Sequence, residues 1–276
     1  MTHRFTQVDV FTAEPLLGNP LAVVHGADDL GDDQMRALAR WTNLSETAFL
    51  LTPTDAQADY RVRIFTPRRE LPFAGHPTLG SCHAWLAAGG RPRGDEIVQE
   101  CGVGLVRIRR DGARLAFAAP PLRRSGDVAP EVLAQIARSL QVDAGAIRAA
   151  QWVDNGPGWV AVMLGSRDEL LAIEPDYDAM NGLELGVVAP WPAGGEAQFE
   201  VRAFISADGG YEDPVTGSLN AGLAQWLIGS GMAAPHYVAS QGTVLQRRGR
   251  VHLVRRGADI WVGGDAIACI EGSLAL

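Results

Sequence analysis

The stretch that decides the fold is RRELPFAGHPTLGSCHAWLAAGG, residues 68–90, together with its echo DPVTGSLNAGLAQWLIGSG at 213–231. PTLGS at 77–81 recurs as PVTGS at 214–218. We expect the proline of each copy to start a helix, because the first helical N–H groups have no partner within the helix and proline therefore costs nothing there. The sequence thus predicts two related helices in two halves of the chain.

Each predicted helix runs for about three turns, is mostly apolar, and is expected to end at Gly89 or Gly229. A helix that is apolar all round belongs in a core. Upstream of the helices, RIF at 63–65 is echoed by RAF at 202–204. The repeat therefore predicts two similar halves, each a curved sheet around a buried central helix.

The rest of the chain reads mostly as strands. Two further helices are expected at 31–43, where Met35, Leu38, Ala39 and Trp41 form an apolar stripe, and at 130–140. The polar, proline-rich stretch 120–130 suggests a domain boundary. Period-two alternation and turn residues predict strands at 4–11, 20–26, 46–53, 58–67, 96–102, 104–112, 113–121, 158–164, 197–206, 237–242, 250–257 and 259–267.

Composition excludes several classes of function. The chain has 276 residues, a net charge of −8 and no lysine, since every basic side chain is arginine. A pyridoxal-phosphate Schiff base and a Walker A loop both need lysine, and nucleic-acid binding needs a clustered positive face. No apolar run approaches the roughly 18 residues of a membrane helix. The three cysteines are widely spaced, which favours a reducing cytoplasm.

The two helix-opening turns are the candidate site. In the repeat, His76 falls opposite Asp213, and each precedes a proline. Unpaired N–H groups and the helix dipole make a helix start attractive to anions, so two such starts facing each other across a cleft between domains would bind a carboxylate. The alternative readings are local: Asp213 caps its helix, His76 is an ordinary turn residue, and Ser218 donates to nearby backbone.

Other site chemistries do not fit the spacing. His76 and His83 are seven residues apart, about 10 Å along one helix, so they cannot share a metal ion. Gly102 and Gly104 lie between strand-like segments without a following helix, which indicates a hairpin turn and not a dinucleotide site. No G-x-S-x-G elbow surrounds Ser218, which counts against a hydrolase triad.

Five motifs in one order carry a family resemblance. They are DVFTAEPLLGNPLAVV, NLSETAFLL, FAGHPTLGSCHAWL, YEDPVTGSLNAGLAQWL and SQGTVLQRRGRV. On these motifs the chain resembles the PhzF-like phenazine-biosynthesis family from residue 8 to about 251, nearly its whole length. That family is similar in fold to diaminopimelate epimerase, which implies an α+β protein of two pseudo-symmetric domains, each a barrel-like, mostly antiparallel sheet around a central helix.

The resemblance also implies domain limits and partners. We expect one domain at 1–119, joined by the last strand at about 266–276, and a second at 120–265, with the active site in the cleft between them. A homodimer in the cytoplasm is expected, with a small carboxylate as substrate and with neither nucleic acid nor membrane as partner.

The resemblance assigns the site residues. The named enzyme of the family isomerises trans-2,3-dihydro-3-hydroxyanthranilate without a cofactor, and its catalytic glutamate falls on Glu46, in NLSETAFLL at 43–51. A carboxylate that takes a proton as base and returns it as acid works best with a pKa near the working pH, which apolar surroundings promote. The positions implied to bind substrate are His76, Asp213, Ser218, Gly75 and Gly217.

Two other functions stay open at this point. One is an amino-acid epimerase or racemase that uses Glu46 and another acid; relatives that racemise amino acids use two opposed cysteines near these turns, and this sequence has none there. The other is a binding protein that keeps the fold without turnover, against which the retained site residues argue. Trp85 and Trp226 are expected in the cores, and Arg247, Arg248 and Arg250 in a solvated turn.

Overall fold

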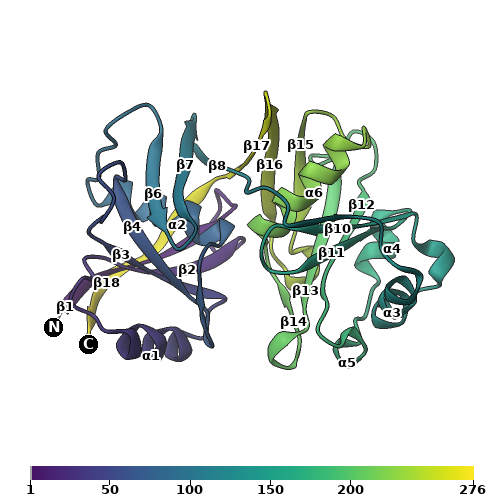
Figure 1. Cartoon of the computed structure of the whole chain (residues 1–276), viewed down its shortest axis with the longest axis horizontal. Helices are drawn as coiled ribbons and strands as arrows, with labels where there is room; N and C mark the ends of the chain where they lie inside the picture. The colour runs from purple at the N-terminus through teal and green to yellow at the C-terminus, as the bar shows by residue number, and fades with distance from the viewer. Residues whose placement is uncertain (1) are drawn as a thin grey trace. The chain divides into compact units, whose positions relative to one another are not determined.

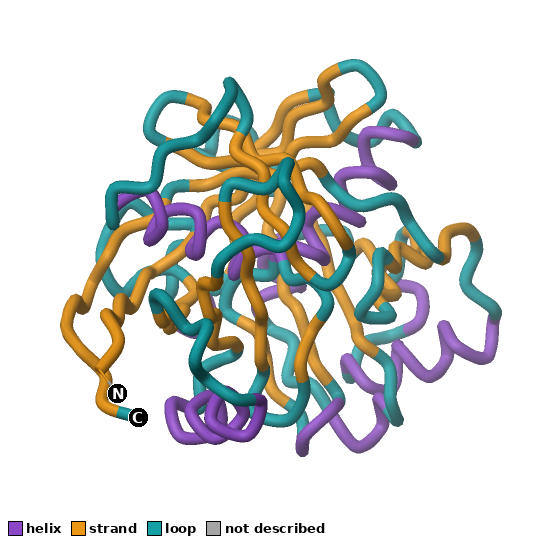
Figure 2. The backbone as a smooth tube through the Cα atoms, turned by 60° about the vertical axis from the view of Figure 1, so that its left-hand side comes forward, coloured by secondary structure: helices purple, strands orange, loops and turns teal. Residues whose placement is uncertain are grey.

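The computed structural model describes residues 2–276 and divides into two compact units. Unit 1 comprises Met1–Ala118 and Gly263–Leu276, and unit 2 comprises Ala119–Val262. Figure 1 labels the elements of both, and Figure 2 shows how much of the backbone is strand. Among residues 2–276, no helix is long and apolar enough to cross a membrane.

Unit 1 is a sheet with one helix on each face. The first and last strands pair antiparallel from Thr2↔Ala275 to Val10↔Ala266, which places the two ends of the chain side by side (Figures 1 and 2). Its elements are β1 (Thr2–Val10), β2 (Asn19–Val24), α1 (Asp32–Thr42), β3 (Glu46–Leu51), β4 (Tyr60–Phe65), β5 (Glu70–Leu71), α2 (Gly75–Ala87), β6 (Ile97–Cys101), β7 (Gly104–Asp111), β8 (Arg114–Ala118) and β18 (Ala266–Ala275).

Unit 2 has the same kind of sheet and more helices. Short 3-10 turns at Ala144–Ala146, Ala207–Gly209 and Thr243–Leu245 join some of its strands. Its other elements are β9 (Arg124–Gly126), α3 (Pro130–Leu140), β10 (Ala149–Asp154), β11 (Trp159–Met163), α4 (Arg167–Leu171), α5 (Tyr177–Met180), β12 (Glu184–Pro190), β13 (Phe199–Ile205), β14 (Tyr211–Asp213), α6 (Gly217–Gly229), β15 (His236–Gln241), β16 (Gly249–Arg256) and β17 (Asp259–Gly264).

Strand pairing repeats from one unit to the other. In unit 1, β2 pairs antiparallel with β1 and parallel with β3, β3 pairs antiparallel with β4, β4 pairs antiparallel with β5 and parallel with β6, and β6 pairs antiparallel with β7. Replacing these strands by β10 to β16 of unit 2, in chain order, reproduces every orientation. The two units are thus internal repeats in topology as well as in sequence.

An arginine–glutamate clasp recurs at the same place in both sheets. In unit 1, Arg63 of β4 donates from Nε and Nη2 to the carboxylate of Glu70 on β5, both at 2.7 Å. In unit 2, Arg202 of β13 donates in the same two-pronged way to Glu212 on β14, at 3.0 and 2.8 Å. The clasps hold short strands β5 and β14, each of which leads into the central helix of its unit.

Neither central helix begins at its proline, contrary to the prediction from the sequence. Helix α2 begins at Gly75, two residues before Pro77, and α6 begins at Gly217, three residues after Pro214. Proline is tolerated at the third position of α2 because the N–H it lacks has no partner within the helix. The prediction that α2 ends at Gly89 is also wrong, since it ends at Ala87; α6 does end at Gly229.

The observed ends of α2 and α6 correct the alignment of the two repeats. Both helices have 13 residues, and both carry a glycine at the sixth position, Gly80 and Gly222, where the helix lies against a strand. A Cβ on Gly80 would lie 2.9 Å from a Val10 side-chain atom, and a Cβ on Gly222 would lie 2.2 Å from the Val153 carbonyl. The counterpart of His76 is therefore Ser218, and not Asp213 as the motif match had suggested.

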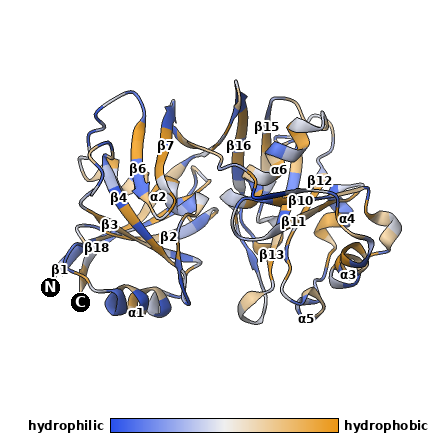
Figure 3. Cartoon of the chain, viewed as in Figure 1, coloured by the Kyte–Doolittle hydropathy of each residue, from blue (hydrophilic) through white to orange (hydrophobic). Residues whose placement is uncertain are grey.

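The two faces of each sheet are covered by different helices. Helix α2 contacts β1, β2, β3, β4, β8 and β18, as expected of a central helix, whereas α1 contacts β3 and β4. The buried stripe of α1 is Met35, Leu38 and Ala39, and the helix is otherwise largely hydrophilic (Figure 3). Trp41, predicted to belong to that stripe, is 80% exposed because it points to another side of the helix.

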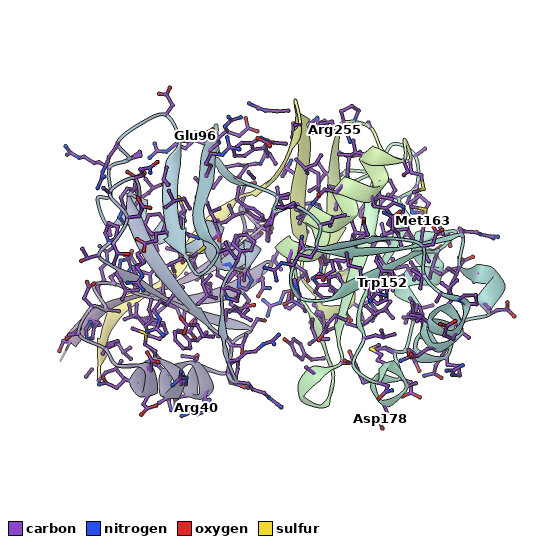
Figure 4. The ribbon with its side chains drawn as sticks, in the orientation of Figure 1. Arg40, Glu96, Trp152, Met163, Asp178 and Arg255 are labelled. Atoms are coloured by element: carbon purple, nitrogen blue, oxygen red, sulfur yellow. The ribbon has the colours of Figure 1, made fainter. Side chains whose placement is uncertain are left out.

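In unit 2, helices α3, α4 and α5 pack on one face of the sheet, and α6 packs on the other against β10, β11 and β16. Trp226 of α6 is buried, and Trp85 of α2 is half-buried and stacks on Tyr60 at 5.1 Å between ring centroids. Trp152 of β10, labelled in Figure 4, is buried beneath the Arg124 guanidinium, 3.3 Å from the ring centroid.

Candidate active site

Glu46 is the first residue of β3, and its side chain faces α2. The next residue, Thr47, points to the other face, where its hydroxyl lies 3.0 Å from that of Thr42 in α1. Phe49 lies on that same face, in the core around α1. Because strand side chains alternate, Glu46 and Ala48 face the central helix. The Glu46 side chain is 15% exposed, so it is mostly buried but keeps some contact with solvent.

His76 meets Glu46 at the start of α2. It is the second residue of the helix, is 4% exposed, and places Nδ1 3.3 Å from Glu46 Oε2. Burial lowers the pKa of His76 from 6.5 to about 3, while a hydrogen bond to the Pro20 backbone opposes that shift. The imidazole is therefore neutral at physiological pH, and this contact joins a carboxylate to an uncharged ring.

The first turn of α2 is fixed by a chain of buried hydrogen bonds. Thr78 donates its hydroxyl to the carbonyl of Ala74, the N-cap residue, at 2.9 Å. Its Oγ1 accepts from Gln99 Nε2 at 3.1 Å, and Gln99 Oε1 accepts from the Tyr60 hydroxyl at 2.9 Å. Gly75, the first helical residue, is buried, so the helix start that carries His76 is held rigidly.

Asp213 ends β14 and belongs to a second buried network. It is 8% exposed, and its Oδ2 accepts from the Thr216 hydroxyl at 2.5 Å. Gln241 Nε2 donates to the Asp213 carbonyl at 3.1 Å and to Thr216 Oγ1 at 2.9 Å, while Gln241 Oε1 accepts from the Thr216 N–H at 3.0 Å. Asn220 also donates to Gln241 Oε1, at 2.8 Å.

Asp213 is therefore not the N-cap of α6. The N-cap is Thr216, whose side chain makes no capping hydrogen bond, and Asp213 lies four residues before the helix. Its bond from Thr216 instead fixes the turn that leads into the helix. The simple capping role considered from the sequence is wrong because β14 continues as far as Asp213.

Ser218 is the second residue of α6 and is half-buried, whereas Gly217, the first, is buried. Trp159 Nε1 donates to Ser218 Oγ at 3.0 Å, and Asn155 Nδ2 donates to the Ser218 carbonyl at 2.8 Å. Ser218 Oγ is thus the acceptor from the Trp159 indole.

The structure brings the predicted residues together in two groups. Glu46, His76 and Gly75 lie together at the start of α2 in unit 1. Asp213, Gly217 and Ser218 lie around the start of α6 in unit 2. Reasoning from the sequence missed four polar or aromatic residues around α6, although Gln241 stands inside the motif SQGTVLQRRGRV: Gln241, Trp159, Asn155 and Asn220.

Arg248 and Arg250 bind groups of the protein itself. Arg248 and Arg250 both donate to Glu196, and Arg250 also donates to the Ser240 hydroxyl at 3.0 Å and to the Gly249 carbonyl at 2.8 Å. Among the side chains that the structure describes, no three from His, Cys, Asp or Glu cluster in a way that could hold a metal ion. Gly102 lies in a hairpin turn between the antiparallel strands β6 and β7, as predicted.

Comparison with known proteins fixes the family. A family model described as "Phenazine biosynthesis-like protein" matches residues 8–272. The chain belongs to this family. The trans-2,3-dihydro-3-hydroxyanthranilate isomerase of Pseudomonas aeruginosa is 34% identical over 283 residues, covering 98% of each protein. The expectation of a PhzF-like enzyme of the isomerase type is therefore confirmed at the level of the family.

Solved structures confirm the fold class. A phenazine biosynthesis protein of the PhzF family from Enterococcus faecalis superposes with a TM-score of 0.83 at 25% identity and covers all of both chains. A hydroxyproline epimerase from Agrobacterium vitis superposes with a TM-score of 0.62 at 15% identity, covering 100% of this chain and 93% of its own. The phenazine biosynthesis-like chain thus shares the α+β epimerase-like fold.

Proposed function

We propose that this member of the phenazine biosynthesis-like family is a cofactor-independent isomerase that uses Glu46 as general base and then as general acid. The substrate is a small, cyclic carboxylate similar to trans-2,3-dihydro-3-hydroxyanthranilate, the compound named for the Pseudomonas aeruginosa relative. Glu46 takes a proton from one carbon, the electron pair of the broken C–H bond joins the π system and shifts the double bond, and Glu46 returns the proton to another carbon.

The contact between Glu46 and His76 carries this proposal. A protonated histidine 3.3 Å away would form an ion pair with the carboxylate and make it a weaker base. Burial holds the pKa of His76 at about 3, so the ring adds no positive charge beside the carboxylate. The neutral ring orients the carboxylate and offers the substrate a hydrogen-bonding nitrogen, a pairing suited to proton transfer.

The binding roles follow from the helix starts. Ser218 and the backbone N–H groups of Gly75 and Gly217 hold the substrate carboxylate, because helix starts favour anions. Asp213 and His76 bind the hydroxyl or amine of the substrate. The buried networks through Gln99 and Gln241 support this assignment, since they make both helix starts rigid and a rigid site needs less reorganisation during the reaction.

The test is proton exchange in heavy water with trans-2,3-dihydro-3-hydroxyanthranilate. Glu46→Gln keeps the shape of the side chain but cannot carry a proton, so product formation and deuterium uptake should fall by about 10²–10⁴-fold. Glu131→Gln, a change at an exposed glutamate of α3, is the matched control. Undiminished exchange in Glu46→Gln would show that another group is the base.

The second candidate is an epimerase that acts on an amino acid. Its support is the similarity in fold to the hydroxyproline epimerase, which is similarity of fold alone at 15% identity. Deuterium uptake at the α-carbon of trans-4-hydroxy-L-proline with inversion would favour this candidate. Under either function we propose a homodimer in the cytoplasm, testable by light scattering and by cell fractionation.

A further inference from the structure

Gln241 and Asp213 lie on the same face of the sheet in unit 2. Asp213 pairs with Ala203 of β13, and Gln241, the last residue of β15, pairs with Val201 of the same strand. Paired residues share a face of a sheet, and so do residues two apart in one strand. Gln241 is fully buried, so every hydrogen-bonding position of its amide must be filled within the protein.

The backbone fixes the orientation of this amide. The backbone carbonyl of Asp213 can only accept, so the Gln241 atom 3.1 Å from it is the nitrogen, Nε2. The Thr216 N–H can only donate, so the Gln241 atom 3.0 Å from it is the oxygen, Oε1. Asn220 Nδ2 donates to the same Oε1 at 2.8 Å and to the Thr216 carbonyl at 2.9 Å, which fixes the Asn220 amide as well.

The direction of the Thr216 hydroxyl follows from this orientation. Gln241 Nε2 donates to Thr216 Oγ1 at 2.9 Å, so the hydroxyl oxygen is the acceptor in that bond. Its single proton is then donated to Asp213 Oδ2, which lies 2.5 Å away. The hydrogen bonds therefore run in one direction, from the Gln241 amide through the Thr216 hydroxyl to the Asp213 carboxylate, and Oδ2 is the acceptor at the end.

We propose that Gln241 is a positioning residue that acts through Thr216 to hold Asp213 as a hydrogen-bond acceptor for the substrate. A hydroxyl that donates to a carboxyl group favours its ionised form, and an ionised carboxylate accepts hydrogen bonds but cannot donate them. The substrate group that binds Asp213 is therefore a donor, either a hydroxyl or an amine. The inference rests on the proposed function, which gives Asp213 this binding role.

Gln241→Glu and Gln241→Met separate this role from a role in rigidity alone. The carboxylate introduced by Gln241→Glu keeps the shape of the side chain but has no N–H, so it accepts the Thr216 proton and takes it from Asp213. Gln241→Met removes the amide bonds but leaves the Thr216 hydroxyl able to donate to Asp213. Rigidity alone predicts that Gln241→Met is at least as harmful to substrate binding, whereas the proposed role predicts that Gln241→Glu is the more harmful change.

The first measurement is the Kd of trans-2,3-dihydro-3-hydroxyanthranilate by calorimetry, in a Glu46→Gln background that should not convert the compound. Gln241→Glu should raise the Kd about tenfold or more, and increasingly from about pH 6 to about pH 9 as the introduced carboxyl group loses its proton. Gln241→Met should raise it less. Thr216→Val should also raise the Kd about tenfold, and Gln241→Glu should then add less than about threefold, because it acts through the missing hydroxyl. Thr216→Ser, which keeps the hydroxyl, should stay within about threefold of the background.

Two analogues of the compound test the donor. One carries hydrogen in place of the hydroxyl, and the other carries hydrogen in place of the amine. The analogue that lacks the donor to Asp213 should bind more weakly than the parent compound, and its Kd should not respond to Gln241→Glu. If both analogues respond as fully as the parent compound, no substrate donor binds Asp213 and the inference is overturned.

The second measurement needs no substrate. In proton NMR of the ¹⁵N-labelled protein, the Thr216 hydroxyl proton, buried in a 2.5 Å bond, should give a slowly exchanging downfield signal that is not split by nitrogen. The signal should persist in Thr216→Ser, be absent from Thr216→Val, and shift or vanish in Gln241→Glu as the pH rises. Gln198→Glu is the matched control, because exposed Gln198 accepts through Oε1 from the Val238 N–H at 2.8 Å, a bond that a carboxylate can also accept.

The outcomes separate this inference from the proposed function. An unchanged Kd in Gln241→Glu at every pH, a larger loss in Gln241→Met, or losses from Gln241→Glu and Thr216→Val that simply add would overturn the role of Gln241 and leave Glu46 untouched. If the compound does not bind at all, the proposed substrate class is wrong, and the hydroxyl signal decides the inference, which is overturned if Gln241→Glu leaves that signal unchanged. If Gln241→Glu does not fold, equal Kd values for Thr216→Val and Thr216→Ser overturn the role.

Discussion

The two arginine–glutamate clasps predict different losses of stability for the same chemical change. In unit 2, Arg202 is 3% exposed and Glu212 is 7% exposed, so Glu212→Gln leaves a buried guanidinium without its carboxylate. Removing one partner of a buried ion pair costs about 3–5 kcal/mol. Arg202 Nη1 keeps bonds to the carbonyls of Leu170 and Ile173, at 3.1 and 2.8 Å, which places the expected loss at the lower end, about 3 kcal/mol.

The clasp in unit 1 is the matched control. Arg63 is 20% exposed and Glu70 is 36% exposed, and Arg63 also binds Asp32 at 2.8 Å, so a carboxylate remains after Glu70→Gln. An ion pair with this much solvent contact contributes about 0–1 kcal/mol. The two substitutions, at equivalent positions of one repeat, should therefore differ by about 2 kcal/mol or more in free energy of unfolding.

Urea unfolding measures both losses when it is followed by circular dichroism, to which the strands of both units contribute. Tryptophan fluorescence adds a second probe for Glu212→Gln, because Trp152, Trp159, Trp191, Trp226 and Trp261 all lie in unit 2. With a slope of about 2 kcal/mol per molar, Glu212→Gln should lower the midpoint by about 1.5 M. Equal losses for the two variants, or a loss below about 1 kcal/mol for Glu212→Gln, would refute the reasoning from burial.

Three shorter predictions concern the central helices. The pKa of His76 in the folded protein, near 3, lies below the unfolded value of 6.5, so the unfolded chain binds more protons between these two pH values. The free energy of unfolding should therefore rise with pH by up to about 1.4 kcal/mol per pH unit in that range and reach its full value above pH 6.5. On acid titration, His76→Asn should lack this dependence on pH. In proton NMR of the wild type, the imidazole signal of His76 is the one that disappears in His76→Asn. That signal should not titrate between pH 5 and 8. Gly222→Ala should lower the free energy of unfolding by about 1–3 kcal/mol or more because its Cβ would lie 2.2 Å from a backbone carbonyl, whereas Gly229→Ala, with open space around it, should change little in the same denaturation assay. Under the proposed function, the Ser218 hydroxyl binds a substrate carboxylate that does not react. Ser218→Ala should therefore raise KM for the substrate more than it lowers kcat, and equal effects on both constants would contradict that role.

The sequence predicted the repeat but not its register. PTLGS and PVTGS match at a spacing of 137 residues, whereas the helix starts, Gly75 and Gly217, lie 142 apart. The link from Phe65 to Gly75 is ten residues, and that from Phe204 to Gly217 is thirteen. The register is set where Gly80 and Gly222 let the helix touch the sheet, and such close approach between distant segments leaves no mark in a local motif.

The sequence also predicted the residues of the candidate site only in part. Glu46, His76 and Ser218 stand in motifs that the family resemblance covers, so the sequence could nominate them. Gln241 also stands in such a motif, but only the strand pairings Ala203↔Asp213 and Val201↔Gln241 place it beside Asp213. Pairing between strands is long-range information, which alternation of apolar residues along one strand cannot supply.

The second residue of the central helix differs between the repeats. It is His76 in unit 1 and Ser218 in unit 2, although the glutamate that begins the third strand and the glycine that begins the helix are the same in both units. Burial keeps the imidazole neutral, and Trp159 donates to the Ser218 hydroxyl. Under the proposed function, His76 accompanies the base Glu46, whereas Ser218 binds the substrate carboxylate. His76→Ser should therefore lower kcat more than it raises KM, and Ser218→His should chiefly raise KM; equal effects of the two changes on both constants would contradict this division of roles.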